Sequence, residues 1–328
     1  MIMSNTSEKP TIFVTRRWPD AAEDALKQFF KPTFNEDDVP LTATQIADGF
    51  ASHDALAPTV SDQITADIIA AGAAGSGRLI ANFGVGVNHI DLSAAASAGL
   101  AVSNTPGVLT DATADLTLAL MLMVSRRAGE GERELRAGEW QGWRPTHLMG
   151  RSLSGKTLGI IGMGRIGKAV AYRAALGFGM KIIFFNRSKV TNITDYDAKQ
   201  IDNLDVLCAQ SDFVSLHCAA SEDTFHILDE ERLKQIQTHA YVINTARGDV
   251  IDEAALVRAL HRGTVGGAGL DVFQGEPDIH PDFMTAPNTV LLPHLGSATV
   301  ETRTAMGLKV VANARAFFAG EHLIDPVV

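Results

Sequence analysis

A glycine-rich turn between two apolar runs limits the fold of this chain more than any other feature. The pattern predicts a strand at 157–162, a helix at 165–176 and a second strand at 181–186. Gly162, Gly164 and Gly167 form G-x-G-x-x-G at the first junction. In this context the glycines permit a tight turn, close approach of a pyrophosphate and close helix packing. Helix-start amides, here at Arg165 and Ile166, favour a bound diphosphate. The unit therefore predicts a dinucleotide site.

Short apolar runs alternate with helical patterns along most of the chain. A first series has strands expected at 11–15, 54–58, 78–84 and 101–106, with helices at 19–30 and 61–72. A second series has strands at 157–162, 181–186, 213–218, 240–245, 266–272 and 289–294, with helices at 165–176, 200–209, 229–236 and 252–262. This rhythm predicts an α/β protein with two doubly wound parallel-sheet, Rossmann-like domains and a cleft between them.

Two long helical patterns suggest how the domains are joined. The first covers 111–140, and the second covers 297–320 and is expected to return to the first series. We therefore expect a discontinuous substrate domain, 1–105 plus 297–328, and a dinucleotide-binding domain, 106–296. The most apolar run, nine residues at 116–124, is far shorter than the ~20 residues of a membrane span.

The charge balance argues against broad classes of partner. Acidic residues number 38 and basic residues 28, so the net charge is −10, and a general attraction to nucleic acid or anionic membranes is not expected. Cys208 and Cys218 are the two cysteines, too few for a disulfide framework. The N-terminus lacks a signal-peptide pattern, so a cytoplasmic location is expected, and no metal site is predicted.

The end of the second strand of the dinucleotide unit bears on the choice of cofactor. Asn186 lies 19 positions after Gly167, where an acidic residue would bind the adenosine ribose of NAD. Arg187, Ser188 and Lys189 follow and supply two cations and a hydroxyl, which suit a 2′-phosphate. These four residues favour NADP(H), and NAD(H) stays open because they also fit an ordinary polar loop.

Three polar residues follow predicted strands of the second series, where parallel sheets bind ligands. They are Arg247, Glu276 and His294. An arginine binds a planar carboxylate, and a histidine paired with a carboxylate transfers protons near neutral pH. Alone each residue fits an ordinary surface role, but together, beyond a dinucleotide site, they suit the reduction of a 2-oxo acid by hydride transfer.

Longer motifs carry a resemblance to a known family. "VINTARGDVIDEAAL" (242–256), "GAGLDVFQGEP" (267–277), "LLPHLGSAT" (291–299), "NFGVGVNHID" (82–91) and "VLTDATADLTLALML" (108–122) resemble the D-isomer-specific 2-hydroxyacid dehydrogenase family. Within that family, "GWRPTHLMG" (142–150) is most similar to the glyoxylate/hydroxypyruvate reductase branch. Glu276 makes the formate dehydrogenase branch, which has Gln there, a poorer match.

The resemblance implies a role for each matching residue. Arg247, Glu276 and His294 would be catalytic, and Val85 and Gly86 would donate amides to the substrate carboxylate. Leu56 would shape the pocket, and Trp143 could lie near a neighbouring subunit's active site. Further contacts to the cofactor would come from Thr113, Thr245, Ala246, Asp271 and Gly296. The family also implies a homodimer.

The expected function is an NADP(H)-preferring reductase of small 2-oxo acids, with glyoxylate and hydroxypyruvate as substrates and 2-hydroxy acids as products. One alternative is a D-2-hydroxyacid dehydrogenase for a larger 2-oxo acid, such as pyruvate, phenylpyruvate or a branched-chain acid. A second alternative, of another class, is a nucleotide-sensing, corepressor-like scaffold, because one branch of the family has that role.

Overall fold

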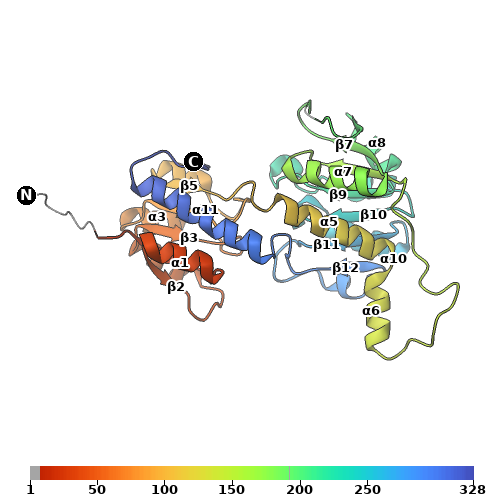
Figure 1. The fold of residues 1–328 in the computed structure, drawn as a ribbon, viewed down its shortest axis with the longest axis horizontal. Helices are drawn as coiled ribbons and strands as arrows, with labels where there is room; N and C mark the ends of the chain where they lie inside the picture. Colours follow the sequence, from red (N-terminus) through yellow and green to blue (C-terminus); the bar gives the residue numbers. More distant parts are fainter. Residues whose placement is uncertain (1–7, 192) are drawn as a thin grey trace, which may run out of the picture. The chain divides into compact units, whose positions relative to one another are not determined.

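The chain divides into two compact units, each built on a parallel sheet. The computed structural model describes residues 8–191 and 193–328. The first unit contains the described chain up to Leu109 together with Ala298–Val328, and the second contains Thr110–Ser297 (Figure 1). The fold class expected from the sequence, two parallel-sheet α/β domains, is confirmed.

The first unit has five strands in the order β2-β1-β3-β4-β5, all parallel. The strands are β1 (Thr11–Val14), β2 (Lys31–Phe34), β3 (Ala55–Ala57), β4 (Leu79–Ala81) and β5 (Ala101–Ser103). The helices are α1 (Asp20–Phe29), α2 (Ala43–Ala51), α3 (Ala66–Ala74), α4 (Leu92–Ser97) and α11 (Val300–Phe318). The final helix, α11, packs beside α1, so the last part of the chain completes the unit in which the chain begins (Figure 1).

Strand alternation divides the core of the first unit between the two faces of its sheet. Ile12 and Val14 join the cluster formed with α1 and α11, whereas Phe13 packs against the cluster formed with α2, α3 and α4. Successive strand residues point to opposite faces, so a strand covered on both sides is apolar throughout.

Among its described residues, 110–191 and 193–297, the second unit has seven parallel strands in the order β12-β11-β10-β9-β6-β7-β8. The strands are β6 (Thr157–Ile161), β7 (Lys181–Phe185), β8 (Ala198–Gln200), β9 (Phe213–Leu216), β10 (Tyr241–Asn244), β11 (Gly267–Leu270) and β12 (Thr289–Leu291). The helices are α5 (Thr110–Ser125), α6 (Ala128–Arg136), α7 (Arg165–Phe178), α8 (Leu204–Gln210), α9 (Glu230–Gln235) and α10 (Glu253–Arg262). Short 3-10 turns lie at Glu222–Thr224, Gly248–Val250 and Pro281–Met284.

The helices of the second unit cover its sheet on both faces. Apolar residues of α5 and α7, such as Leu118 and Val170, pack on one face, and those of α8, α9 and α10, such as Leu207 and Leu256, pack on the other. The strand order reverses direction between β6 and β9, each of which starts one half of the sheet. Ligands of open α/β sheets bind at such a point, beyond the carboxyl ends of the strands.

Several expected elements differ from those observed. The helix expected over 111–140 is two helices, because Arg127 adopts a left-handed conformation (φ 52°) between α5 and α6. The helix expected at 61–72 begins at Ala66, because Asp62 is buried and its carboxylate accepts hydrogen bonds from Thr15 and Thr59 in a turn. The helix expected at 200–209 begins at Leu204 after the N-cap Asn203. Strands β2 and β8 and helices α2 and α4 were not predicted.

The structure adds two observations about what the described residues lack. Within 8–191 and 193–328, no helix is both long and apolar enough to cross a membrane. The same ranges contain no group of three or more His, Cys, Asp or Glu side chains placed to hold a metal ion.

Candidate active site

The glycine-rich turn between β6 and α7 is crowded on one side and open on the other. A Cβ atom on Gly162, whose φ is +98°, would lie 2.6 Å from the Cys218 nitrogen. A Cβ on Gly167 would lie 2.3 Å from the Gly162 carbonyl oxygen, so the helix packs directly on the turn. A Cβ on Gly164 would meet nothing within 4 Å. Two of the glycines are therefore required by packing, and the third leaves room for a ligand.

The N-terminus of α7 suits an anion. The helix begins at Arg165, its N-cap Gly164 has no side chain, and its first turn contains no acidic residue. Its first amides therefore keep their partial positive charge. These features fit the pyrophosphate of a dinucleotide, which would be held by the turn at 162–164 and by the amides at Arg165 and Ile166.

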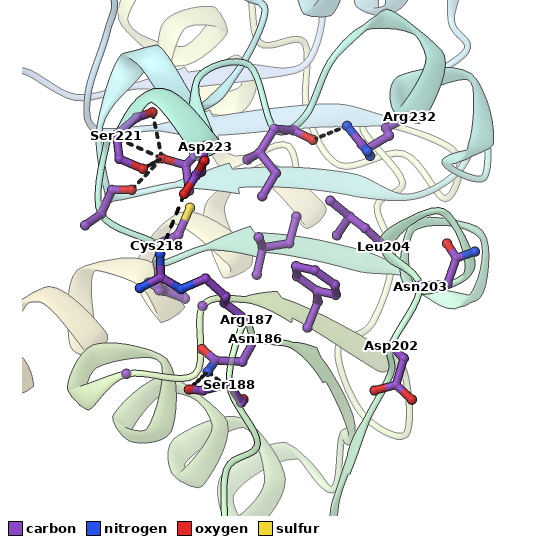
Figure 2. Close-up of a pocket in the computed structure, with 18 of the residues that line it drawn as sticks. Asn186, Arg187, Ser188, Asp202, Asn203, Leu204, Cys218, Ser221, Asp223 and Arg232 are labelled. Carbon is purple, nitrogen blue, oxygen red and sulfur yellow. Dashed lines mark hydrogen bonds and ion pairs between the residues drawn. The ribbon is translucent and has the colours of Figure 1, made fainter.

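A cavity of about 1590 Å³ opens beside this turn (Figure 2). Its walls come from the ends of β6, β7 and β9 and from the segments that follow them, and they include Gly162, Gly164, Asn186, His217 and Cys218. His217 Nδ1 is buried without a hydrogen-bond partner among the described residues, and burial lowers the pKa of His217 to about 3. The histidine is therefore neutral, and its Nε2 atom shares a hydrogen bond with the Ser215 hydroxyl (2.9 Å).

Asn186 links the glycine-rich turn to the loop that follows β7. Its amide oxygen accepts a hydrogen bond from the Met163 amide (3.1 Å). Its amide nitrogen donates to the Ser188 carbonyl (2.9 Å) and hydroxyl (3.1 Å) (Figure 2). The side-chain amide of Gln200, on β8, donates to the carbonyls of Asn186 and Ser188. Asn186 therefore orders the loop, and Arg187, Ser188 and Lys189 are its exposed polar groups.

Arg187 extends across the mouth of the cavity toward an acidic residue (Figure 2). Its guanidinium lies 3.7 Å from the Asp223 carboxylate, and the two side chains are 90% and 79% exposed. An ion pair this exposed contributes roughly 0–1 kcal/mol, so a bound anion can replace it. Sequence reasoning missed Asp223, which lies 36 residues beyond Arg187 and comes near it only in the fold.

The three candidate catalytic residues come from the ends of neighbouring strands. Arg247 follows β10, Glu276 follows β11 and His294 follows β12, and these strands are adjacent in the sheet. Since all the strands are parallel, these residues lie at the same edge of the sheet as the glycine-rich turn after β6.

His294 and Glu276 form a direct pair. Their Nδ1 and Oε2 atoms are 2.8 Å apart, and both side chains are about one-third exposed. Burial alone would raise the pKa of Glu276, but the hydrogen bond and charge of His294, the Phe273 amide and the Arg247 guanidinium lower it below its ordinary value. Glu276 is therefore a carboxylate at neutral pH that orients the imidazole and leaves Nε2 for a substrate.

Asp271 holds the backbone that carries His294. The carboxylate is 1% exposed and accepts hydrogen bonds from the Leu295 amide (2.7 Å) and the Gly296 amide (2.8 Å). Burial raises the pKa of this carboxyl group above its ordinary value. His294 itself is left-handed (φ 56°), and its amide donates to the Asp271 carbonyl (2.9 Å). The expected contact of Asp271 with nicotinamide stays a prediction, and in this structure both its oxygens hold the turn.

Two threonines on α5 form hydrogen bonds with the segments that follow β10 and β12. Thr113 donates from its hydroxyl to the Gly296 carbonyl (3.1 Å), and Thr117 shares a hydrogen bond with Thr245 after β10 (2.9 Å). Ala246, next in the chain, is half-buried. The cofactor contacts expected of Thr113, Thr245, Ala246 and Gly296 stay predictions.

Arg247 is positioned by the last residue of β10. Asn244 donates from its side-chain amide to the Arg247 carbonyl (2.8 Å) and accepts from the Ala246 amide (2.9 Å), which forms a tight turn at the strand end. Burial lowers the pKa of Arg247, and the Glu276 and Asp249 carboxylates oppose that shift. Arginine stays charged even so, and a partly desolvated guanidinium binds a carboxylate more strongly than one in water. Sequence reasoning missed Asn244, although it immediately precedes the T-A-R motif.

Val85 and Gly86 belong to the first unit and form a turn beyond β4. The Asn82 side chain donates to the carbonyls of Gly84 (3.1 Å) and Gly86 (2.9 Å), and Asn104 donates to the carbonyl of Val85 (2.8 Å). These contacts involve the carbonyl groups of Val85 and Gly86 and not their amides. The expected donation of the two amides to a substrate carboxylate is compatible with this arrangement and stays a prediction.

Leu56 and Trp143 have opposite environments. Leu56, on β3, has no exposed surface and packs in the core of the first unit with Ile46 and Phe50, and its role in shaping the pocket stays a prediction. Trp143, in the loop after α6, is 82% exposed. Its predicted role near a neighbouring subunit stays a prediction.

Comparisons with known proteins identify the family of this chain. Residues 118–296 match the family model "D-isomer specific 2-hydroxyacid dehydrogenase, NAD binding domain". A glyoxylate reductase of Thermococcus litoralis is 40% identical over 317 residues, which cover 95% of each chain. The chain therefore belongs to the D-isomer specific 2-hydroxyacid dehydrogenase family and is an NAD(P)-dependent oxidoreductase acting on 2-hydroxy acids.

Solved structures extend the likeness to the whole fold. The NADPH-dependent glyoxylate/hydroxypyruvate reductase of Sinorhizobium meliloti, in complex with NADP and malonate, has 32% identity and a TM-score of 0.87 over 98% of this chain and 97% of its own. The D-mandelate dehydrogenase of Rhodotorula graminis has 27% identity and a TM-score of 0.86 over 98% of each chain.

Proposed function

We propose that this protein is an NADP(H)-preferring reductase of small 2-oxo acids, with glyoxylate and hydroxypyruvate as its substrates. The observation that carries the proposal is the 2.8 Å pair of His294 and Glu276, beside the partly buried guanidinium of Arg247. A proton donor held by a carboxylate and a cation for the substrate carboxylate are what the reduction of a 2-oxo acid requires.

Each of the three residues has one task in the proposed reaction. Arg247 binds the substrate carboxylate and polarises the neighbouring ketone. His294 donates the Nε2 proton to the carbonyl oxygen, and Glu276 stabilises the imidazolium before the transfer. A bound nicotinamide cofactor supplies the hydride. In the direction of oxidation, neutral His294 accepts the hydroxyl proton.

The preference for NADP(H) rests on the loop after β7. Arg187, Ser188 and Lys189 are exposed at the cavity wall, and Asn186 adds no negative charge there. A 2′-phosphate gains charge-assisted hydrogen bonds from such groups and would be repelled by a carboxylate. The Sinorhizobium meliloti reductase, crystallised with NADP, supports the use of this cofactor.

The choice of a small substrate rests on the relatives. The Thermococcus litoralis protein and a Korarchaeum cryptofilum protein, each 40% identical to this chain, are glyoxylate reductases. The D-mandelate dehydrogenase has the same fold, so the fold alone does not select the substrate. A homodimer, with exposed Trp143 near the partner's site, and a cytoplasmic location are further parts of the proposal.

A substrate panel crossed with both cofactors tests this function. Glyoxylate, hydroxypyruvate, pyruvate, phenylpyruvate and a branched-chain 2-oxo acid would each be assayed with NADPH and NADH. We expect the highest kcat/KM for glyoxylate or hydroxypyruvate with NADPH. A higher value for phenylpyruvate would contradict the proposed substrate, and a higher value with NADH would contradict the cofactor preference. Turnover of none would favour the nucleotide-sensing scaffold.

A further inference from the structure

A buried carboxylate lies behind the loop that carries Glu276. Glu253 is the first residue of α10, after the N-cap Asp252, and it is 6% exposed. Its Oε1 atom accepts a hydrogen bond from the Gln274 amide at 2.7 Å. The mechanism proposed above gives this side chain no task, although burial of a carboxylate is costly unless its contacts offset the loss of water.

The hydrogen bond from Gln274 belongs to a pair of neighbouring contacts. The preceding amide, that of Phe273, donates to Glu276 Oε1 at 2.8 Å. Two successive amides are thus held by two carboxylates, and one of these is the carboxylate that orients His294 through its other oxygen. The position of the Phe273–Gln274 peptide therefore influences where the Glu276 carboxylate lies.

The same peptide also supports the segment that carries Arg247. Gly248 follows Arg247, and a Cβ atom on Gly248 would lie 2.0 Å from the Phe273 carbonyl carbon and 2.1 Å from the Gln274 nitrogen. The two backbones are therefore in direct contact, without an intervening side chain. A displacement of the Phe273–Gln274 peptide would be transmitted both to Arg247 and to Glu276.

We propose that Glu253 is a positioning residue for the reaction, because it anchors the Phe273–Gln274 peptide against which Arg247 and Glu276 are set. It acts through the Gln274 amide and does not touch the substrate. The proposal rests on the roles given to Arg247, Glu276 and His294 under the proposed function. It does not depend on which 2-oxo acid is reduced.

The carboxyl group of Glu253 has its pKa in the neutral range. Burial raises the pKa of Glu253 to about 7; the Gln274 amide opposes this rise, and the carboxylates of Asp249, in the turn after β10, and Glu276 add to it. A carboxylate accepts a stronger hydrogen bond than a neutral carboxyl group. The bond to Gln274 should therefore strengthen as the pH rises through 7.

Three variants at position 253 separate the effect of side-chain length from the effect of side-chain charge. Glu253→Ala removes the acceptor, Glu253→Asp keeps the charge but shortens the side chain, and Glu253→Gln keeps an oxygen acceptor without charge. Glu230→Gln is the matched control, because Glu230 is also the first residue of a helix after an Asp N-cap, but its side chain is exposed. Activity is measured with whichever 2-oxo acid the wild type reduces best, together with the Kd of NADPH and the unfolding temperature.

We expect Glu253→Ala and Glu253→Asp to lower kcat by between about tenfold and 100-fold, since displacements near 1 Å cost this much in a catalytic site. The NADPH Kd should change less than about twofold, because the cofactor turn after β6 is untouched. Glu253→Gln should recover most of the loss, and Glu230→Gln should match the wild type. If Glu253→Ala does not fold, Glu253→Asp carries the comparison. Wild-type kcat in Glu253→Asp would overturn the proposal.

A second readout is independent of turnover. The ring nitrogens of His294 are followed by NMR in ¹⁵N-labelled protein from pH 5 to 9, with the signals assigned by His294→Asn. We expect the Nδ1 signal to move in Glu253→Asp and to return toward the wild-type position in Glu253→Gln. An unmoved signal in Glu253→Asp would also overturn the proposal. If the wild type reduces no 2-oxo acid, the proposed function fails, whereas this spectrum still decides the role of Glu253.

Discussion

His294 and Glu276 meet across 2.8 Å, although they leave the sheet from different strands. The pair uses Nδ1 of the imidazole, and Asp271 fixes the backbone on the far side of His294 through the amides of Leu295 and Gly296. The ring is therefore oriented by Glu276 and its backbone is anchored by Asp271. A proton donor held in this way is prepared before the substrate arrives.

Replacement of the proton donor should abolish most turnover. We expect His294→Ala to lower kcat by about 10²–10⁴, the usual contribution of a general acid, while the NADPH Kd stays within about twofold. Stopped-flow measurement of NADPH oxidation checks the rate, and fluorescence titration checks the Kd. His261→Ala, at an exposed histidine in the last turn of α10, is the control and should keep full activity. A kcat near the wild-type value in His294→Ala would remove this residue from the mechanism.

Loss of the guanidinium should affect both binding and rate. We expect Arg247→Ala to raise the KM of the 2-oxo acid by about 10- to 100-fold and to lower kcat, because the carboxylate loses a partly desolvated cation. Arg247→Lys should recover only part of the loss, since an ammonium cannot form the paired hydrogen bonds of a guanidinium. Steady-state kinetics measures KM and kcat of these variants, with Arg262→Ala as a surface control that should match the wild type. An unchanged KM in Arg247→Ala would argue against this role.

The ion pair at the mouth of the cavity predicts how cofactor choice can be altered. Arg187→Ala should raise the KM of NADPH about tenfold and leave that of NADH nearly unchanged, because NADH has no 2′-phosphate. Asp223→Asn should lower the KM of NADPH by about two- to threefold, because the competing carboxylate is removed. Lys199→Ala, an exposed cation on β8, serves as the control. Equal effects of Arg187→Ala on both cofactors would contradict recognition of the phosphate.

A carboxylate at position 186 should reverse the preference. Asn186→Asp keeps an oxygen that can accept from the Met163 amide, so the glycine-rich turn should survive. The new charge would repel a 2′-phosphate and accept hydrogen bonds from the ribose hydroxyls of NADH. We expect the ratio of kcat/KM for NADPH over NADH to fall by about tenfold or more. An unchanged ratio would show that Asn186 does not contribute to selectivity.

The buried Glu253 predicts a pH dependence of stability. Its folded-state pKa, about 7, lies above the ordinary 4.5, so the folded state holds the proton more tightly than the unfolded state. This contribution is fully present below about pH 4.5 and is lost as the pH rises through 7. Glu253→Gln does not undergo this loss. Its free energy of unfolding minus that of the wild type should therefore be more positive, meaning a relatively more stable variant, at pH 8 than at pH 5. Denaturant titrations at both pH values measure it, and a difference of the opposite sign would contradict the raised pKa.

Local patterns in the sequence predicted the α/β class and the elements that lie in the cores. The glycines at 162, 164 and 167 and the apolar runs of β6 and β7 act over a few residues, where spacing alone decides the geometry. The short edge strands β2 and β8 were missed, since Lys31–Phe34 and Ala198–Gln200 lack a continuous apolar run. The break at Arg127 was missed because nothing in the helical pattern of 111–140 marks a left-handed residue.

The sequence by itself determined which chemical groups the chain has: a glycine turn for a dinucleotide, Arg247, Glu276 and His294 at strand ends, and no acid at position 186. Only the tertiary structure decided which of them meet. The pairing of His294 with Glu276, the approach of Asp223 to Arg187 and the anchoring of Gln274 by Glu253 all join residues 18 or more positions apart. Such contacts depend on strand order and loop packing, which short-range spacing does not encode.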